Sequence, residues 1–315
     1  MNVELGVERI YASESADAGR GRIAWSPAKS IWIGGMTLSA ILLAPIYFSW
    51  SAFAVFLVTC AVTLCFGHSV GMHRRLIHKS FDCPRWLEYV CVYLGTLVGM
   101  AGPLGMVKLH DFRDWAQRQP DCHDYFCHRK NFWHDAWWQL HCELVLSNPP
   151  DFLPEPKLRD DRFYEFIERT WMLQQLPWAL LLLFVGGVAW VVWGIFARIA
   201  ICVTGHWLVG HFAHREGDQS WIVEGAGVQG YNVRIAGLIS MGEGWHNNHH
   251  AFPGSAKLGL QPGEVDPGWW LIKAFERLGL ATNIVTPEIM PYRATLKTLH
   301  PNSADPCHTH VFMLR

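Results

Sequence analysis

Two long stretches that are almost free of charge constrain the fold of this chain more than any other feature. Residues 31–67 contain no Asp, Glu, Lys or Arg, and residues 171–210 contain one such residue, Arg198. A helix crosses the hydrocarbon core of a membrane with about 20 apolar residues, so each stretch is long enough for two spans. We therefore expect two antiparallel helical hairpins, the second turning near residues 190–194, and the polar segments on one side of the membrane.

The composition agrees with a membrane protein and excludes other classes. Half of the residues are hydrophobic, 17% are charged, and the mean hydropathy is +0.10. The 17 tryptophans suit rings that anchor a protein at the membrane surface. A formal net charge of −1 provides no basic field for nucleic acid, and nine cysteines without paired spacings predict no disulfide framework.

The charge pattern divides the chain into five segments. They are a polar, basic cytoplasmic tail (1–30), the first transmembrane hairpin (31–67), the first part of a cytosolic cap (68–170), the second hairpin (171–210) and the second part of the cap (211–315). Both termini and the cap are then cytoplasmic. Residues 89–107 are apolar and rich in glycine, which fits a third span, a re-entrant segment or a helix packed under the cap.

The motif with the clearest chemistry is residues 242–253, Gly-Glu-Gly-Trp-His-Asn-Asn-His-His-Ala-Phe-Pro. On a helix His246, His249 and His250 stand at i, i+3 and i+4, so three imidazoles leave one face within reach of a common metal ion. Three histidines on a solvated helix are the alternative, but clustered imidazoles repel one another when they are protonated. The spacing therefore predicts a metal site.

Other histidines fall on the same predicted side of the membrane. His73 and His78 follow the first hairpin with His68 just before them, and His206 lies near the end of the second hairpin. His73 and His78 are about 140° apart on an ideal α-helix, so we expect them to flank one ion from adjacent positions. Neutral imidazoles suit iron and oxygen chemistry, and zinc fits the same ligand type. Beside a membrane, an alkyl chain is the obvious substrate for attack on a C–H bond.

These motifs resemble those of the membrane-bound fatty acid desaturases, most closely the acyl-CoA Δ9 desaturase branch, from the first span to about Met290. His73-Arg-Arg-Leu-Ile-His78 is similar to the family's first histidine box, and His246-Asn-Asn-His-His250-Ala-Phe-Pro to its third. His206 is similar to an extra histidine after the fourth span. The resemblance implies an all-α fold, with a stalk of four transmembrane helices and a cytosolic helical cap that holds a histidine-rich site for two irons.

The second box departs from the family's His-x-x-His-His. Aligned through Gly102-Pro103-Leu104, it becomes His110-Asp111-Phe112-Arg113-Asp114. Asp114 can ligate iron, whereas Arg113 offers no lone pair. Cys202 stands where the family has an asparagine that holds a water near one iron, so the second iron is in doubt.

Three outcomes follow for the second iron. His68 supplies the missing imidazole, one of His123, His128 and His134 folds back to do so, or the site is mononuclear or inert. We favour replacement, because an abandoned site has little reason to keep a complete third box. A surface or supporting role through hydrogen bonds is the competing expectation for His123, His128, His134 and His141.

The expected function is that of an O2-dependent di-iron fatty acyl desaturase, which introduces a cis double bond into an acyl chain carried by CoA, a carrier protein or a phospholipid. No catalytic residues are expected beyond the metal ligands, and no organic cofactor. Two electrons must come from a partner such as ferredoxin, rubredoxin or cytochrome b5, because no nucleotide- or haem-binding motif is present. The expected ligands are His73, His78, His110, Asp114, His206, His246, His249 and His250, with His68 as an additional candidate.

Two other interpretations remain at this stage. One is a hydroxylase, or a desaturase of an unusual lipid, on the same scaffold; analysis of the product distinguishes it. The other is a catalytically silent membrane protein that binds lipid or zinc. For that protein His246→Ala would alter stability without changing any lipid.

Overall fold

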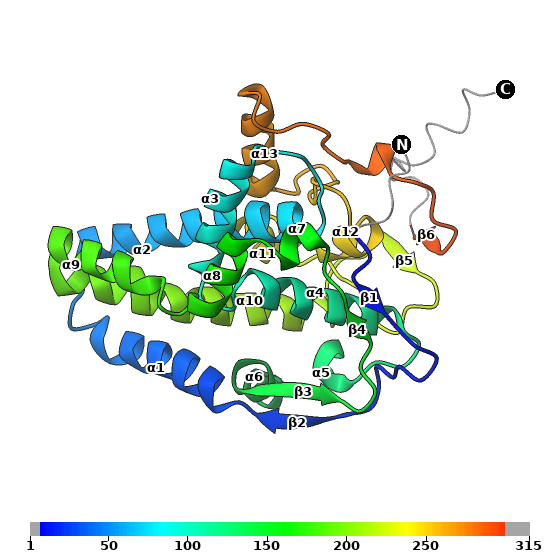
Figure 1. Ribbon diagram of the computed structural model, residues 1–315, viewed down its shortest axis with the longest axis horizontal. Coiled ribbons are helices and arrows are strands. Elements are labelled where there is room, and N and C mark those ends of the chain that lie inside the picture. Colours follow the sequence, from blue (N-terminus) through cyan, green and yellow to red (C-terminus); the bar gives the residue numbers. More distant parts are fainter. Residues whose placement is uncertain (1–6, 300–315) are drawn as a thin grey trace.

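The structure is a computed structural model that describes residues 7–299, and helices dominate it, as expected for an all-α protein (Figure 1). The longer helices are α1 (Pro27–Leu43), α2 (Trp50–Val62), α3 (Arg85–Thr96), α4 (Pro103–Arg118), α6 (Phe132–His141), α8 (Arg162–Thr170), α9 (Gln175–Val191), α10 (Arg198–Ala213) and α13 (Pro267–Arg277). The shorter ones are α5 (Asp124–Cys127), α7 (Pro156–Arg159), α11 (Arg234–Ile239), α12 (His246–Ala251) and the 3-10 turn η3 (Pro287–Ile289). Two π-helical segments, η1 (Thr63–Ile77) and η2 (Val192–Ala197), continue α2 and α9.

The strands of the described residues are short and form three antiparallel pairs. They are β1 (Ile10–Tyr11) with β4 (Asp151–Phe152), β2 (Gly21–Trp25) with β3 (Cys142–Leu146), and β5 (Trp221–Val223) with β6 (Leu296–Thr298). None of them builds a larger sheet, so helix packing organises the fold.

The apolar helices lie side by side and extend from one end of the molecule. α1 packs against η2 and α10, while α2 packs against α9 and η2. Figure 1 shows α1, α2 and α9 reaching to the left beyond the other elements. Two helices, Trp50–Ile77 and Gln175–Ala213, are long and apolar enough to cross a membrane, and α1 is a shorter apolar helix. Their outer faces expose large apolar side chains such as Phe184, which is 91% exposed, and this surface indicates association with a membrane.

The second apolar stretch turns at Gly187, earlier in the chain than residues 190–194. Gly187 has a φ of +71°, a left-handed conformation that glycine adopts without strain. A Cβ on Gly194 would lie 2.7 Å from Leu182 Cδ1, and two residues twelve positions apart meet only if the chain reverses between them. The two segments on either side of Gly187 therefore form the expected hairpin with a shifted turn.

The single charge of this hairpin is satisfied inside the bundle. Arg198 is 2% exposed, and its guanidinium donates to the carbonyl oxygens of Gly194 and Leu97 and to Gln175 Oε1. An arginine within an apolar span is tolerated when its donors face protein acceptors in this way. The bond to Leu97 also fastens the bundle to the end of α3.

Residues 89–107 form no span. They fold as α3 and the start of α4, with a break at Gly99, and α3 packs along η1. A Cβ on Gly67 would lie 2.3 Å from the Gly95 backbone nitrogen, so the backbones of the two helices are in direct contact. Of the three expectations for this segment, the packed helix is the one that the structure contains.

Gly67→Ala will destabilise the fold, because the added Cβ meets backbone atoms that cannot move aside. Forcing a methyl group into a packed interface costs about 1–3 kcal/mol. Gly35→Ala in α1 is the matched control, since nothing lies within 4 Å of its Cβ position and alanine favours a helix. Thermal unfolding in detergent, followed by tryptophan fluorescence, should show a lower midpoint for Gly67→Ala alone. Equal midpoints would contradict the close packing of η1 and α3.

The first described residues are folded against the cap, although the sequence predicted a tail for residues 1–30. Arg9 is 2% exposed and donates two hydrogen bonds to the carboxylate of Glu155, at 2.6 and 3.1 Å. The same guanidinium donates to the carbonyl oxygens of Leu76 and Ile77, both at 3.1 Å. The N-terminal segment thus holds the end of η1, where the first histidine box lies.

The segment that carries the third histidine box is fastened to η1 from the other side. Arg74 in η1 is 1% exposed and donates to Asp266 Oδ1 at 2.8 Å and to the Ala256 carbonyl at 3.0 Å. Ser69, also in η1, donates to Glu243 Oε1 at 2.6 Å. These bonds place α12 and its histidines against η1.

Candidate metal centre

Four histidines from separate parts of the chain bring their ring nitrogens together. They are His73 in η1, His78 just after it, His110 in α4 and His249 in α12, and we call them the first histidine group. One ring nitrogen of each lies within 4.8 Å of those of the others. His78 Nε2 is 3.1 Å from His73 Nε2 and 3.3 Å from His110 Nε2. Converging imidazole nitrogens with lone pairs are what a transition metal ion binds.

The π-helical form of η1 explains how His73 and His78 meet. The His78 N–H donates to the His73 carbonyl at 3.0 Å, an i→i+5 bond that replaces the i→i+4 bond of an α-helix. This wider turn brings the two side chains to one face, with ring centroids 4.7 Å apart. The separation of about 140° expected from an α-helix therefore does not apply here.

Three further histidines form a second histidine group. His246 and His250 in α12 join His214, which directly follows α10. His246 Nε2 lies 3.0 Å from His214 Nε2 and 3.2 Å from His250 Nε2. His214 Nδ1 donates to the Gly210 carbonyl at 2.7 Å, so its Nε2 carries the lone pair that faces the group.

Burial keeps these imidazoles neutral. It lowers the pKa of His78, His214, His246 and His249 well below the usual range, and neighbouring histidines act in the same direction. Burial also lowers the pKa of His250 to about 4. The neutral imidazole is the form that binds metals, and a donor set of imidazoles without thiolates fits iron. The residues present in both groups therefore fit the metal that a desaturase-like site requires.

Two carboxylates border the first histidine group. Glu243 Oε2 lies 2.6 Å from His73 Nδ1, and the other oxygen of this carboxylate accepts a hydrogen bond from Ser69 at 2.6 Å. Asp114 Oδ1 lies 3.8 Å from His110 Nε2. Burial opposes its ionisation, but His110 and Arg118 outweigh burial and hold the pKa of Asp114 below its ordinary value. Asp114 is thus an anionic oxygen donor at the edge of the group.

His206 belongs to neither histidine group within residues 7–299. Its ring packs edge to face against His68, with centroids 5.0 Å apart, and His68 Nδ1 is buried without a hydrogen-bond partner. Cys202 lies on the same helix, and its Sγ is 3.7 Å from Cys60 Sγ inside the apolar bundle. The structure thus brings six of the eight expected ligands into the two groups, places Asp114 at their edge and leaves His206 outside.

Sequence reasoning missed His214 as a member of the second group. The signal was its place in the chain, because His214 is the first residue after the apolar helix Gln175–Ala213. It therefore emerges on the polar side, where the other histidines gather, whereas His206 still lies within the helix. The position of each residue relative to the end of the apolar helix, Ala213, distinguishes His214 from His206.

Arg113 lies close enough to the second histidine group to act on it. After burial and neighbouring histidines, its positive charge contributes to the lowered pKa of His214 and His246. Its Nε is buried without a hydrogen-bond partner in the described structure. A guanidinium cannot ligate a metal ion, so the second group offers three imidazoles with a cation beside them.

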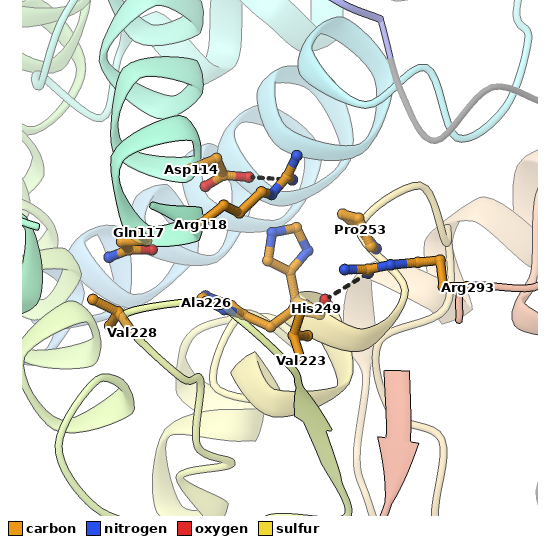
Figure 2. A pocket seen from close by; sticks show the side chains of 10 residues that line it. Asp114, Gln117, Arg118, Val223, Ala226, Val228, His249, Pro253 and Arg293 are labelled. Carbon is orange, nitrogen blue, oxygen red and sulfur yellow. Dashed lines mark hydrogen bonds and ion pairs between the residues drawn. The ribbon is translucent and has the colours of Figure 1, made fainter. Parts of the chain in front are cut away.

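Two clefts border the first histidine group. One is narrow, with room for about one water molecule, and it is lined by His249 and His250 and flanked by Arg118 and Arg293. Figure 2 shows His249 between the Asp114–Arg118 pair on one side and Arg293 on the other. A larger cleft, of about 220 Å³, is lined by His78 and Asp114. Of the two, the larger cleft is the one with room for a small molecule beside His78.

Comparison with known proteins agrees with this geometry. The family model described as fatty acid desaturase matches residues 48–260, which include both histidine groups and most of the apolar bundle. The chain belongs to the fatty acid desaturase family. The family resemblance seen in the sequence is thereby confirmed, and this desaturase-family chain is an oxidoreductase of lipid metabolism that acts on fatty acyl chains.

Several relatives match over most of their length. An sn-1 stearoyl-lipid 9-desaturase from Anabaena variabilis is 36% identical over 241 residues, which cover 76% of this chain and 86% of the relative. An acyl-CoA 5-desaturase from Anemone leveillei is 34% identical over 259 residues, 82% of this chain and 78% of the relative. A probable chloroplastic lipid desaturase from Arabidopsis thaliana is 36% identical over 273 residues, 85% and 73% of the two chains. This desaturase-family member is thus similar to proteins named for lipid-linked and for CoA-linked substrates.

Proposed function

We propose that the chain is an O2-dependent di-iron desaturase that introduces a cis double bond into a fatty acyl chain. The observation that carries this proposal is the convergence of seven imidazoles in two adjacent groups, four in the first and three in the second. Bound iron would supply the activation of O2 that is needed to oxidise an unactivated C–H bond. Two neighbouring methylenes each lose one hydrogen, and O2 takes up these hydrogens, two electrons and two protons to give two waters.

The protein's own residues would bind the two metal ions and exclude water from them. His73, His78, His110 and His249 bind one ion with Asp114 as an oxygen donor, and the second histidine group binds the other. Glu243, whose Oε2 lies 2.6 Å from His73 Nδ1, would place a carboxylate beside the first group. The burial that keeps the imidazoles neutral also excludes bulk water from the reacting atoms.

The electrons come from outside the chain in this proposal. The sequence has no motif for a nicotinamide, a flavin or haem, so a small redox protein such as ferredoxin, rubredoxin or cytochrome b5 would deliver them one at a time. The acyl group is a CoA or carrier-protein thioester, or a chain linked to a membrane lipid. The names of the relatives support both kinds of carrier, since they include acyl-CoA and acyl-lipid desaturases.

The proposed topology has four membrane spans, with both termini and the metal centre in the cytoplasm. The pairing of β2 with β3 supports an even number of crossings between residues 25 and 142, because it holds these two points on one side of the membrane. The reversal at Gly187 supports a second pair of spans. α1, α2 with η1, α9 and α10 would be the spans.

The altered second histidine box favours a second candidate, a hydroxylase or a desaturase of an unusual lipid. Arg113 and Asp114 replace two imidazoles beside the reacting atoms, and such a change of donors alters the oxidising power of a metal site. In that case the host would accumulate a hydroxy acid or a modified unusual lipid. Mass spectrometry of the products distinguishes the two candidates.

Expression in a host that supplies a working electron donor tests the proposal. Gas chromatography with mass spectrometry should reveal a new unsaturated acid with the wild-type chain and none with His249→Ala, because this change removes one imidazole from the first histidine group. His141→Ala is the control, since that ring stacks on Trp137 away from both groups. An unchanged lipid profile with the wild-type chain would refute the desaturase function.

A further inference from the structure

A third cluster of buried polar side chains has no place in the proposed ligand set. Asp135 in α6 is fully buried, and its Oδ2 accepts hydrogen bonds from His128 Nδ1 at 2.9 Å, His211 Nδ1 at 2.7 Å and Trp207 Nε1 at 2.8 Å. Because a carboxylate oxygen only accepts, both imidazoles donate through Nδ1 and keep the lone pair on Nε2. A carboxylate bonded to the far nitrogen of an imidazole is the usual arrangement behind a histidine that ligates a metal.

His128 is the member of this cluster that faces the second histidine group. Its ring lies nearly parallel to the His214 ring, at 11°, with centroids 5.4 Å apart. His211 instead packs against the rings of Phe132 and Trp207, at 5.6 and 5.9 Å. Within residues 7–299, no ring contact joins His211 to the second group. His128 is thus the residue of this cluster in ring contact with the second group, although its nitrogens lie outside the set within 4.8 Å of one another there.

The backbone conformation at His128 and the glycine at position 210 together make room for the His128 ring. His128 directly follows α5 with a left-handed conformation, φ 52° and ψ 33°, which residues other than glycine adopt only at a cost. A Cβ on Gly210 would lie 3.3 Å from His128 Nε2, so the ring edge rests on α10 where a side chain is missing. The carbonyl of the same glycine accepts the bond from His214 Nδ1. One turn of α10 therefore supports both imidazoles.

The spacing of the rings agrees with a shared ion. With metal–nitrogen bonds of about 2.1 Å, two imidazoles on one ion have ring centres roughly 5 Å apart. The three ring pairs of the second histidine group lie at 4.6, 4.7 and 5.5 Å. The His128–His214 distance of 5.4 Å falls in the same range.

We propose that His128 is a fourth protein ligand of the metal ion in the second histidine group, and that Asp135 positions it. His128 then supplies the imidazole that the second histidine box lacks at Arg113. The inference rests on the proposed two-ion function. It names a ligand outside the three histidine boxes, from the connection between α5 and α6.

The iron content of the purified protein, measured by elemental mass spectrometry, tests this ligand without any assay of activity. His128→Gly suits the left-handed backbone and leaves a ring-sized hole. We expect this variant to hold about one iron per chain where the wild-type protein holds about two, and free imidazole to restore the second. Asp135→Asn should raise the dissociation constant of the second iron about 10–100-fold in a chelator titration.

His134→Ala is the matched control, because His134 is exposed on α6 and its ring packs only on Trp138 in the described structure. It should retain both irons. If His128→Gly keeps two irons, or loses both and does not recover them with imidazole, His128 is no ligand. If the wild-type chain holds fewer than two irons, the two-ion function fails, and the assignment of His128 fails with it.

Discussion

His214→Ala will remove one iron and abolish desaturation, whereas His206→Ala will keep both irons and most of the activity. The reason is that His214 Nε2 faces His246 Nε2 at 3.0 Å, while the His206 ring packs on His68 outside both groups. Loss of a residue that only supports a ligand already costs about 10–100-fold in metal affinity or activity, and loss of the ligand itself should exceed that. Iron content and the yield of the unsaturated acid are measured in parallel.

Each variant is a control for the other, because His206 lies within α10, His214 directly follows it, and both residues are changed to alanine. Equal expression and equal melting midpoints would show that neither substitution unfolds the chain. A loss of iron from His206→Ala together with full iron in His214→Ala would reverse the assignment. His206 would then be the ligand, as the family resemblance alone implies.

Asp266→Ala will destabilise the protein by about 3–5 kcal/mol, because it leaves a buried arginine without its counter-ion. Asp266 is 2% exposed, and its Oδ1 accepts from Arg74 at 2.8 Å. The same carboxylate caps α13 by accepting the Trp269 backbone N–H at 2.9 Å, and its Oδ2 accepts the Leu258 N–H at 2.8 Å. Thermal unfolding in detergent should show a midpoint lower by roughly 10 °C.

The same variant should also weaken iron binding, because Arg74 neighbours His73 in η1 and holds the segment that carries α12. Asp160→Ala is the control, since Asp160 forms its ion pair with Arg159 on the surface, where both side chains are more than half exposed. Exposed pairs of this kind contribute little to stability. A midpoint for Asp266→Ala that matches this control would show that α12 is held by other contacts.

Much of the fold follows from sequence patterns that operate over short distances. The charge-free stretches predicted the apolar hairpins. The spacing of His246, His249 and His250 predicted one common metal ion, but the structure divides them, with His249 in the first histidine group and His246 and His250 in the second. The turn of the second hairpin was predicted near residues 190–194, because the sequence alone does not show which glycine in the middle of the stretch reverses the chain. Gly187 is the one whose positive φ reverses the chain.

The remaining features depend on contacts that no local pattern reveals. The π-helix at His73 and His78 replaces an α-helical bond, and nothing in the spacing of apolar residues marks that change. The role of residues 7–25 depends on partners more than a hundred positions away. His214 was missed for a different reason. His206 and His214 are close in sequence, and only the position at which the apolar helix ends distinguishes them.

The position of Arg9 has a consequence for the order in which the protein can assemble during synthesis. Its partner Glu155 follows 146 residues later in the chain. At translation rates of about 5–20 residues per second, Arg9 is made roughly 7–30 s before Glu155. Residues 9–25 therefore wait for partners that are made much later, and a nascent chain that stalls before residue 142 presents an unpaired edge at β2. Such a chain is one that chaperones and proteases can recognise as unfinished.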